Sequence, residues 1–348
     1  MKRVYLDWNA SEPLSNAASK AMISSLKHYG NPSSVHLEGR DARSALERAR
    51  DQIAELIGLP SRSLIVFTSG ATEGASMVLH SKTFKCAPIE HDCVRGWANQ
   101  DLAVSEDGLV EVTEPENSSL QLANSESGII QDIPDNIFFT DSVQAFGKIP
   151  INFSNFLYEF AIISSHKIGG PKGIGALIVS DFAAIEPMIR GGGQESGLRS
   201  GTECLTNILG FASAVEHKLG ELKLGVQFEI EKKRNYLERM VKDANKDTII
   251  VGEKVQRLPN TSYILTPGWK SDLQVACLDL EGFSVSAGMA CSSGKTGIGK
   301  GLLSMGYSNG LSECAIRVSI GSSTSNIELE RFVDVWSLHA KHWKRRAA

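Results

Sequence analysis

The sequence lacks an apolar run of about 18 residues, the length that a membrane-spanning helix requires. Its start, MKRVYLDWNASEPL, becomes polar at Asp7 before a signal-like apolar stretch develops. We therefore expect a cytoplasmic protein that has no membrane partner. The chain also has no excess of basic residues, as its formal net charge of -4 shows. For this reason nucleic acid is not an expected partner.

The six cysteines form no C-x-x-C pair, and no Cys/His group has the spacing of a zinc site. We therefore expect no metal site, and in a chain of 348 residues we expect no disulfide framework. Five thiols lie in apolar or helical contexts and are interpreted as packing residues: Cys86, Cys93, Cys204, Cys277 and Cys314. Cys93 is the least certain of these, since it lies two residues after His91.

The pattern of apolar residues predicts an α/β fold. Hydrophobic residues make up 42% of the chain and charged residues 22%, which suits a large core and about two domains. Apolar runs of strand length occur at 64–67, 120–123, 137–140, 161–164 and 176–179. Because their apolarity is continuous, both faces of these strands should be covered. This arrangement is typical of a mostly parallel sheet between helices.

Helical periodicity accompanies these runs. Apolar residues at steps of three and four predict a helix that follows Ser33 and is closed by Gly58, and a second long helix over 226–244. Ser325 and Glu328 have the spacing of a capping box and predict the start of a last helix. Alternating segments near the end indicate a smaller α+β domain. We assign 14–215 to the large domain, and 1–13 with 216–348 to the small domain.

Three segments have the composition of a binding site. The turn TSGATEGASM at 68–77 places hydroxyls and small residues where a helix begins, which suits a phosphate, although such turns are equally often empty. Asp141 directly follows a strand and is either a helix N-cap or the partner of a protonated cofactor ring nitrogen. Lys167 lies in SSHKIGGPKGIGALIV, between a strand and a glycine-rich turn. In this order the three segments suit a Schiff base between Lys167 and pyridoxal phosphate.

Nine segments in a fixed order carry a family signature: YLDWNASEP, GNPSSVH, FTSGATE, EHDCV, DSVQAFGKIPI, SSHKIGGPKGIGALIV, GGGQESGLRSGT, SAGMACSS and IRVSIG. Together they resemble the cysteine desulfurases of the NifS and IscS type, in the class V aminotransferase family, along nearly the whole chain. The resemblance implies the pyridoxal-phosphate-dependent transferase fold of type I, which is aspartate aminotransferase-like. It also implies removal of sulfur from L-cysteine, with L-alanine and an enzyme persulfide as products.

The resemblance implies pyridoxal 5'-phosphate as the cofactor, bonded to Lys167. Asp141 is expected to pair with its ring nitrogen, and Gln144 to hydrogen-bond its phenolic oxygen. His91 is expected to stack on its ring, with a buried structural histidine as the alternative. The residues expected around the phosphate are Ala71, Thr72, Ser164 and His166, with Thr202 reaching the phosphate of the neighbouring subunit in a homodimer.

Substrate binding and sulfur transfer are expected from residues farther along the chain. Arg317 alternates with two apolar neighbours on an apparent strand and suits the substrate α-carboxylate, with Asn31 as a helper; a structural salt bridge is the alternative. Cys291 lies in a small-residue, glycine-rich stretch suited to a mobile loop. The resemblance implies that freed Lys167 moves the α-proton and that the Cys291 thiolate attacks the substrate sulfur. The persulfide then passes to an acceptor protein in iron-sulfur or thio-cofactor biosynthesis.

Two positions depart from the family pattern. Ser125 stands where the family has an asparagine that faces the cofactor, so its hydrogen bond is expected to run through water. Ser11-Glu12-Pro13 replaces T-T-P and adds a charge beside the substrate. A selenocysteine lyase and an aminotransferase for small amino acids are alternatives, although Cys291 argues against transamination. A catalytically inactive partner subunit is a further alternative, opposed by the presence of the lysine, carboxylate and thiol.

Overall fold

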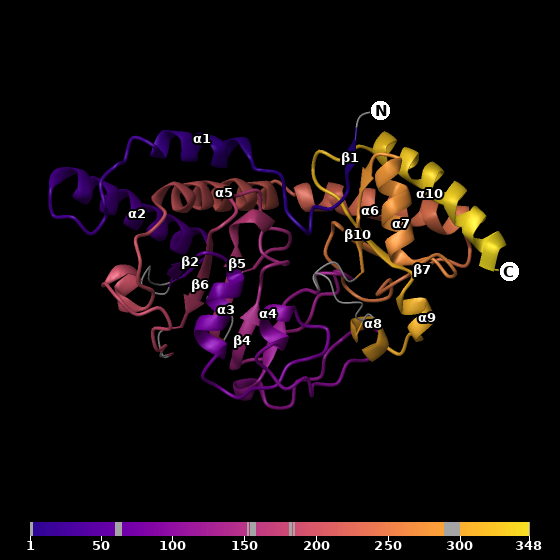
Figure 1. Ribbon diagram of the computed structural model, residues 1–348, viewed down its shortest axis with the longest axis horizontal. Helices are drawn as coiled ribbons and strands as arrows, with labels where there is room; N and C mark the ends of the chain where they lie inside the picture. Colours follow the sequence, from indigo (N-terminus) through magenta and orange to yellow (C-terminus); the bar gives the residue numbers. More distant parts are fainter. Residues whose placement is uncertain are drawn as a thin grey trace.

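The computed structural model describes residues 3–59, 65–151, 153, 158–180, 183, 185–288 and 300–347. These residues form two lobes (Figure 1). The larger lobe holds a five-stranded sheet between helices, and the smaller lobe holds short strands covered by long helices. Both chain ends lie at the smaller lobe. The α/β architecture predicted from the apolar runs is confirmed.

The sheet of the larger lobe has the strand order β2-β6-β5-β4-β3. Its strands are β2 (Ile65–Thr68), β3 (Ser119–Gln121), β4 (Ile137–Asp141), β5 (Tyr158–Ser164) and β6 (Gly175–Val179). β3, β4 and β5 pair in parallel, whereas β6 is antiparallel to both of its neighbours. All of their residues except Glu159 are buried, so the continuous apolarity reflects cover on both faces.

Helices cover both faces of this sheet. α1 (Asn16–Ser25), α2 (Leu37–Leu56) and α5 (Leu205–Lys223) pack together, while α3 (Ala71–Leu79) packs against β5 and β6. Neighbouring residues of β6 point into different cores: Ile178 joins the core with α2 and α5, and Leu177 joins the core with α3. The period of two along each strand therefore divides the lobe into two apolar layers.

The ends of α2 follow from its sequence. Nδ1 of His36 accepts a hydrogen bond from the amide of Gly39 and caps the first turn. Gly58 has a φ of 78°, a left-handed conformation that a glycine adopts without strain after a helix. The helix predicted after Ser33 and closed by Gly58 is therefore confirmed.

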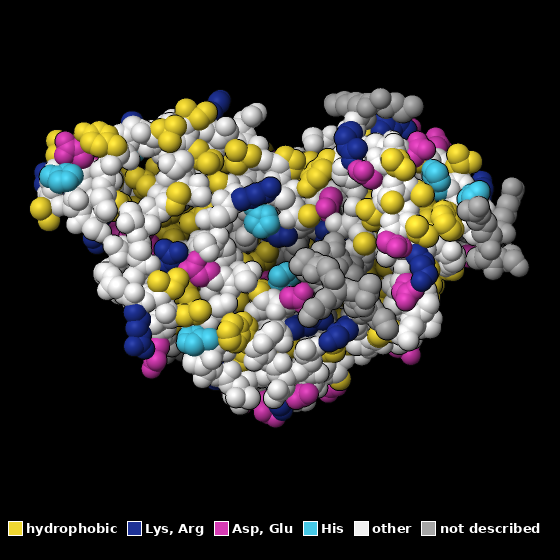
Figure 2. Space-filling model, viewed as in Figure 1, with side chains coloured by type: hydrophobic (Ala, Val, Ile, Leu, Met, Phe, Trp, Pro, Cys, Tyr) yellow, Lys and Arg dark blue, Asp and Glu magenta, His cyan; other side chains and the backbone are white. Residues whose placement is uncertain are grey.

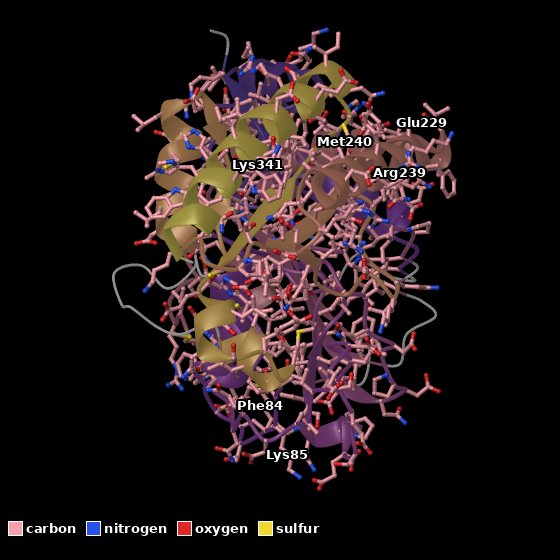
Figure 3. The ribbon with its side chains drawn as sticks, turned by 90° about the vertical axis from the view of Figure 1, so that its right-hand side faces the viewer. Phe84, Lys85, Glu229, Arg239, Met240 and Lys341 are labelled. Carbon is pink, nitrogen blue, oxygen red and sulfur yellow. The ribbon has the colours of Figure 1, made fainter. Side chains whose placement is uncertain are left out.

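The smaller lobe contains the sheet β10-β11-β8-β7, which is antiparallel, and the parallel pair β1-β9. Its strands are β1 (Val4–Tyr5), β7 (Ile249–Ile250), β8 (Thr261–Leu265), β9 (Phe283–Ser284), β10 (Ser286–Ala287) and β11 (Ala315–Ser319). Its long helices are α6 (Val226–Ala244), α7 (Ser271–Leu280) and α10 (Asn326–Ala347). Figure 3 shows α10, which carries Lys341, lying across the outer side of this lobe.

Two predictions about this lobe are confirmed in detail. α6 covers the predicted range 226–244. The capping box of the last helix is present, because Ser325 N donates to Glu328 Oε2 at 2.8 Å and Glu328 N donates to Ser325 Oγ at 3.3 Å. The remaining short elements are α4 (Asp92–Arg95), α8 (Lys300–Ser304), α9 (Asn309–Ser312) and the 3-10 helices η2 (Pro115–Asn117), η4 (Ser165–Lys167) and η5 (Gln194–Gly197).

The domain division predicted at residue 215 falls inside a helix. α5 continues to Lys223, and Gly225, with a φ of 76°, separates it from α6. The amino-terminal segment joins the smaller lobe through β1, whose Val4 pairs with Phe283 of β9. None of the helices in the described ranges is long and apolar enough to cross a membrane.

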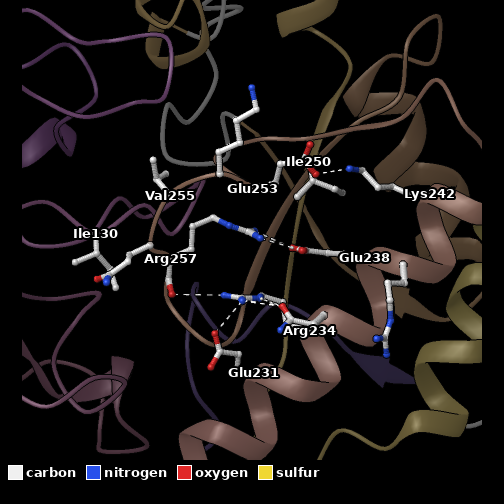
Figure 4. Close-up of a pocket in the computed structure, with 13 residues that line it drawn as sticks. Ile130, Glu231, Arg234, Glu238, Lys242, Ile250, Glu253, Val255 and Arg257 are labelled. Atoms are coloured by element: carbon white, nitrogen blue, oxygen red, sulfur yellow. Dashed lines mark hydrogen bonds and ion pairs between the residues drawn. The ribbon is translucent and has the colours of Figure 1, made fainter.

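The lobes also touch through a turn of the larger one. Ile130 N donates to Gln256 O at 3.0 Å, and Leu258 N donates to Gly128 O at 2.8 Å. A polar cavity of about 790 Å³ lies beside this contact (Figure 4). Arg257 faces Glu238 of α6 across it and donates two hydrogen bonds of 2.7 and 2.9 Å. We interpret this ion pair as a contact that stabilises the packing of the turn before β8 against α6.

Candidate active site

A cavity of about 530 Å³ lies where β2, β4 and β5 end, next to the amino-terminal segment. The carboxyl ends of parallel strands are the usual place for a ligand site in an open α/β sheet. The cavity is lined by Ala10, Ser11, Ser69, Gly70, Ala71, Thr72, His91, Cys93, Gln121, Ala123, Ser125, Asp141, Val143, Gln144, Ser164, His166, Lys167, Lys172, Gly173 and Ile174. Figure 2 shows histidine and basic side chains near the middle of one face, where the lobes meet.

One end of the cavity is formed by the amino terminus of α3. Gly70 precedes the helix, and the first-turn residues Ala71 and Thr72 line the cavity. Amides at such a position have no partner within the helix and suit an anion. The turn is held by Glu73, whose Oε2 accepts from Ser69 N at 2.6 Å and whose Oε1 accepts from Arg199 Nε at 2.8 Å. This clamp keeps the amides in a fixed orientation.

Close backbone packing brings this turn to the sheet. A Cβ on Gly175 of β6 would lie 2.9 Å from the carbonyl carbon of Gly70 and 3.0 Å from the amide nitrogen of Ala71. Both contacts are with backbone, which has no room to move aside. Glycine at position 175 is therefore the reason that the helix terminus reaches the edge of the cavity.

Basic and hydroxyl side chains surround the same end. Ser164, His166 and Lys172 all line the cavity. Burial, together with the positive charges of Lys167 and Lys172, lowers the pKa of His166 to about 4, so its ring is neutral at pH 7. Its buried Nδ1 has no hydrogen-bond partner within the described residues. This end of the cavity therefore offers donors to an anion.

The cavity is also lined by a buried carboxylate. Asp141 ends β4 and lines the cavity. Its Oδ1 accepts a hydrogen bond from Val143 N at 2.9 Å, which forms a local turn, and no helix begins there. The helix N-cap alternative is therefore wrong. Burial raises the pKa of Asp141, and His91 and Lys167 oppose this rise, so the carboxylate favours a cationic partner in the cavity.

Lys167 lines the same cavity, and its charge acts on both Asp141 and His166. It is the last residue of η4, directly after β5, and its Nζ donates to the carbonyl oxygens of Asn9 at 2.6 Å and Ala10 at 3.1 Å. These carbonyls belong to the amino-terminal segment. Lys167 is thus a partly buried lysine whose amine contacts the backbone of this segment at the cavity.

His91 is also a cavity residue. It caps α4, because its Nδ1 accepts from Cys93 N at 3.2 Å. A neutral imidazole that accepts at Nδ1 carries its proton at Nε2. The ring is partly exposed rather than buried in a core, so the structural alternative for His91 is not favoured. Burial raises the pKa of the neighbouring Cys93 thiol, which favours its packing role.

A buried polar network connects the cavity to the smaller lobe. Asn9 is fully buried, and its carbonyl oxygen accepts from Gln144 Nε2 at 3.0 Å as well as from Lys167. Its Oδ1 accepts from Lys148 Nζ at 3.0 Å and from Asn260 Nδ2 at 2.9 Å. Lys148 Nζ also donates to Gln144 Oε1 at 2.6 Å. Asn9 is therefore the centre of a network that spans both lobes.

Arg317 is buried on β11 and lies next to the cavity. Its guanidinium donates to the carbonyl oxygen of Ser125 at 3.0 Å, to Ser286 Oγ at 3.1 Å and to Asp7 at 2.7 Å. The salt bridge with Asp7 is the alternative considered from the sequence. Ser125 lines the cavity while its carbonyl holds the guanidinium. The added charge of Glu12 is paired with Lys218 at 2.7 Å and does not line the cavity.

The structure brings most of the predicted site residues together and leaves others apart. Nine of them line the cavity: Ala71, Thr72, His91, Ser125, Asp141, Gln144, Ser164, His166 and Lys167. Asn31 and Thr202 are exposed and do not line it. Cys291 lies outside the described residues.

Sequence reasoning missed several cavity residues and the network behind them. Gln121 and Lys172 line the cavity, and Lys148 and Asn9 hold Gln144. Lys148 follows Gln144 by four residues, a spacing that brings the two side chains together in a helical turn. Asn9 gives no such signal, because its partners are more than 100 positions away in the chain.

The arrangement fits pyridoxal phosphate. The amides of α3 and the side chains of His166 and Lys172 suit its phosphate, and the carboxylate of Asp141 suits its ring nitrogen. The unpartnered Nδ1 of His166 is a polar atom that a ligand would satisfy. Lys167, which lines the same cavity, is the amine that would bond to its aldehyde.

Comparisons with known proteins find relatives along most of the chain. The family model for aminotransferase class-V matches residues 4–91 and 106–332. The chain is 33% identical to cysteine desulfurase IscS of Dictyoglomus turgidum, over 96% of this chain and 94% of that protein. It is also 33% identical to the mitochondrial cysteine desulfurase of Arabidopsis thaliana, over 95% of this chain and 81% of that protein.

Solved structures give the same result. A NifS-like protein superposes with a TM-score of 0.87 and 29% identity, over 98% of this chain and 100% of that one. SspA in complex with cysteine superposes with a TM-score of 0.74 and 26% identity, over 92% of this chain and 99% of that one. The chain therefore belongs to the class-V aminotransferase family and has the fold of its NifS-like members.

Proposed function

We propose that the protein is a pyridoxal-phosphate-dependent L-cysteine desulfurase, which converts L-cysteine to L-alanine and an enzyme persulfide. The observation that carries this proposal is that Lys167, the amino terminus of α3 and the carboxylate of Asp141 all line one cavity. The relatives are named cysteine desulfurases, and one of the similar structures is a complex with cysteine. Both names support cysteine as the substrate.

Each end of the cavity has a role in holding the cofactor. Ala71, Thr72, Ser164 and His166, which line the cavity, would bind the phosphate, and Asp141 would keep the ring nitrogen protonated. Gln144 and Ser125 would hold the phenolic oxygen, and His91 would stack on the ring. Bound in this way, pyridoxal phosphate supplies an electron sink for the substrate's α-carbon.

The protein side chains then bind the charged substrate and transfer protons. The guanidinium of Arg317, which lies next to the cavity, binds the substrate carboxylate and fixes the orientation of the α-carbon. Lys167 Nζ takes the α-proton, since it is the amine at the reacting centre. His91, whose Nδ1 is occupied by Cys93 N, presents Nε2 to exchange a proton with the substrate.

Sulfur leaves through a thiol. The Cys291 thiolate attacks the sulfur of the substrate cysteine, an S–S bond forms, and the C–S bond breaks. The electron pair of that bond stays with the carbon skeleton, which takes up a proton at the β-carbon, regains one at the α-carbon from Lys167 and becomes alanine. The terminal sulfur of the persulfide then passes to a thiolate of an acceptor protein.

A homodimer completes the site in this proposal. Hydrophobic side chains are exposed over the region of α1 and the start of α2 (Figure 2). The large ones from the end of α1 to the first residue of α2 are Ile23, Leu26, Tyr29, Val35 and Leu37. An apolar patch of this kind suits a subunit interface. Thr202, which is exposed here, would reach the phosphate of the neighbouring subunit. The cytoplasmic location stays a prediction.

The test is mass spectrometry of the purified protein after exposure to L-cysteine, together with assays of sulfide and alanine. We expect one added sulfur atom on Cys291 and loss of sulfide release in Cys291→Ser. Cys93→Ser is the matched control, because its thiol lines the cavity and has a raised pKa; it should keep the added sulfur and its turnover. Alanine without an added sulfur, or unchanged turnover in Cys291→Ser, would contradict the proposal.

A further inference from the structure

Lys148 is buried behind the cavity and is not among the residues that line it. It lies one position after Gly147 and four after Gln144, in the segment that follows β4. Its Nζ has two acceptors, Gln144 Oε1 at 2.6 Å and Asn9 Oδ1 at 3.0 Å. The described part of the chain places no carboxylate in salt-bridge contact with it. A buried lysine without an anionic partner is costly and calls for a function.

The contact with Lys148 decides which way the Gln144 amide points. A lysine amine donates to an amide oxygen and is repelled by an amide NH₂ group, so Oε1 must face Lys148. Nε2 then faces the other way and donates to the carbonyl oxygen of Asn9 at 3.0 Å. An amide nitrogen has two hydrogens, and the second is available to a group in the cavity that Gln144 lines.

We propose that Lys148 is a positioning residue that locks the Gln144 amide with its nitrogen toward the cofactor's phenolic oxygen. This inference rests on the proposed binding of pyridoxal phosphate. Asn9 is part of the lock, because it accepts from both side chains and is itself held by Asn260. Without Lys148, the amide is free to turn its oxygen toward the cavity, where it would oppose the negative phenolic oxygen.

The lock has a measurable consequence for the proton on Lys167 Nζ in the loaded protein. A donor at the phenolic oxygen stabilises the negative charge that this oxygen carries after the nitrogen loses its proton. A locked Gln144 therefore lowers the pH at which the proton is lost. The visible absorption band of the bound cofactor changes at that pH, so the midpoint can be read from spectra without any turnover.

The experiment compares pH titrations of the visible band in the cofactor-loaded wild type, Lys148→Met, Gln144→Met and the double variant. We expect Lys148→Met to raise the midpoint by about one pH unit, the size of a lost hydrogen bond to a charged group. Gln144→Met should raise it similarly, and the double variant should not exceed Gln144→Met, because both changes remove the same donor. An unmoved midpoint in Lys148→Met, or shifts that add in the double variant, would overturn the proposal.

Lys218→Met is the matched control. Lys218 is also buried near the same network, but its partners are Glu12 at 2.7 Å and Glu221 at 3.0 Å, and it does not contact Gln144. The titration midpoint of Lys218→Met should equal that of the wild type. A rise in Lys218→Met as large as the rise in Lys148→Met would overturn the proposal. If Lys148→Met does not fold, Lys148→Gln replaces it. The glutamine side chain is one bond shorter than lysine, so we expect it to raise the titration midpoint by a smaller amount. No rise in Lys148→Gln would overturn the inference. A wild type without a visible band would instead contradict the proposed cofactor.

Discussion

The guanidinium of Arg50 and the carboxylate of Glu195 are joined by two buried hydrogen bonds, of 2.7 and 2.9 Å. Glu195 Oε2 also accepts from Phe67 N of β2 at 2.8 Å. The pair therefore ties α2 and the central sheet to the segment at 190–201. Glu195 and Ser196 have φ angles of 47° and 57°, a left-handed backbone that neighbouring contacts must hold.

Replacement of one partner should be strongly destabilising. We expect Arg50→Met to lower the free energy of unfolding by about 3–5 kcal/mol, because it leaves the Glu195 carboxylate buried without its cation. Lys232→Met is the control, since Lys232 pairs with Glu229 on the surface and such a pair contributes about 0–1 kcal/mol. Urea unfolding of the cofactor-loaded protein measures the free energy of unfolding of both variants. An equally small decrease in the two variants would contradict a stabilising role for the Arg50–Glu195 pair.

Glu90 should make stability depend on pH. Burial, and next the charge of Asp141, raise the pKa of Glu90 to about 8, so its carboxyl is largely protonated at pH 7. A pKa raised above its unfolded value gives stability that is present at low pH and is lost as the pH rises through the folded pKa. Between about pH 5 and 8 the wild type should therefore lose on the order of 1–4 kcal/mol through this group.

Glu90→Gln removes the titration and keeps the shape. The difference in unfolding free energy between the variant and the wild type should shift in favour of the variant as the pH rises from 5 to 8. Urea unfolding at several pH values measures this difference. A difference that stays constant over this range would show that Glu90 is ionised throughout.

Gly175 should be required for cofactor affinity. Gly175→Ala places a Cβ against backbone atoms of the α3 turn, and overpacking of this kind costs about 1–3 kcal/mol. We expect the dissociation constant for pyridoxal phosphate to rise about tenfold or more. Gly220→Ala is the control: a Cβ there meets no heavy atom within 4 Å, and alanine is the better helix former in α5. Equal affinities in the two variants would contradict the role of the turn.

Arg317 should affect substrate binding more than turnover. Arg317→Lys removes the planar fork that holds a carboxylate, so we expect the KM for cysteine to rise about 10- to 100-fold with a smaller fall in kcat. Steady-state kinetics measure both. Arg257→Lys is the control, because Arg257 pairs with Glu238 away from the cavity. A KM that stays unchanged in Arg317→Lys would identify the salt bridge with Asp7 as the role of this arginine.

The sequence predicted the elements whose cause is local. The buried strands, α2 with its Gly58 end, α6 and the capping box at Ser325 follow from periodicity and end residues that lie close together in the chain. The two-residue strands β1 and β9 were not predicted. They exist because Val4 pairs with Phe283, and a short sequence does not reveal a partner so far away.

The residues that line the cavity were predicted from motifs, whereas the buried polar residues that hold them in place were not. Lys167, Asp141 and the α3 turn lie in recognisable segments at strand ends, and the structure brings them to one cavity. Lys148 and Asn9 are ordinary polar residues in the sequence. Their importance comes from burial and from contacts between the two lobes, which only the folded chain reveals.

The most direct test of the account is to treat the purified protein with borohydride, which fixes an amine bonded to an aldehyde, and to locate the label by mass spectrometry of the digest. The account predicts a reduced pyridoxyl group on Lys167 in the wild type and no label in Lys167→Ala. A label on another lysine, or a wild type that carries no label after incubation with pyridoxal phosphate, would contradict it.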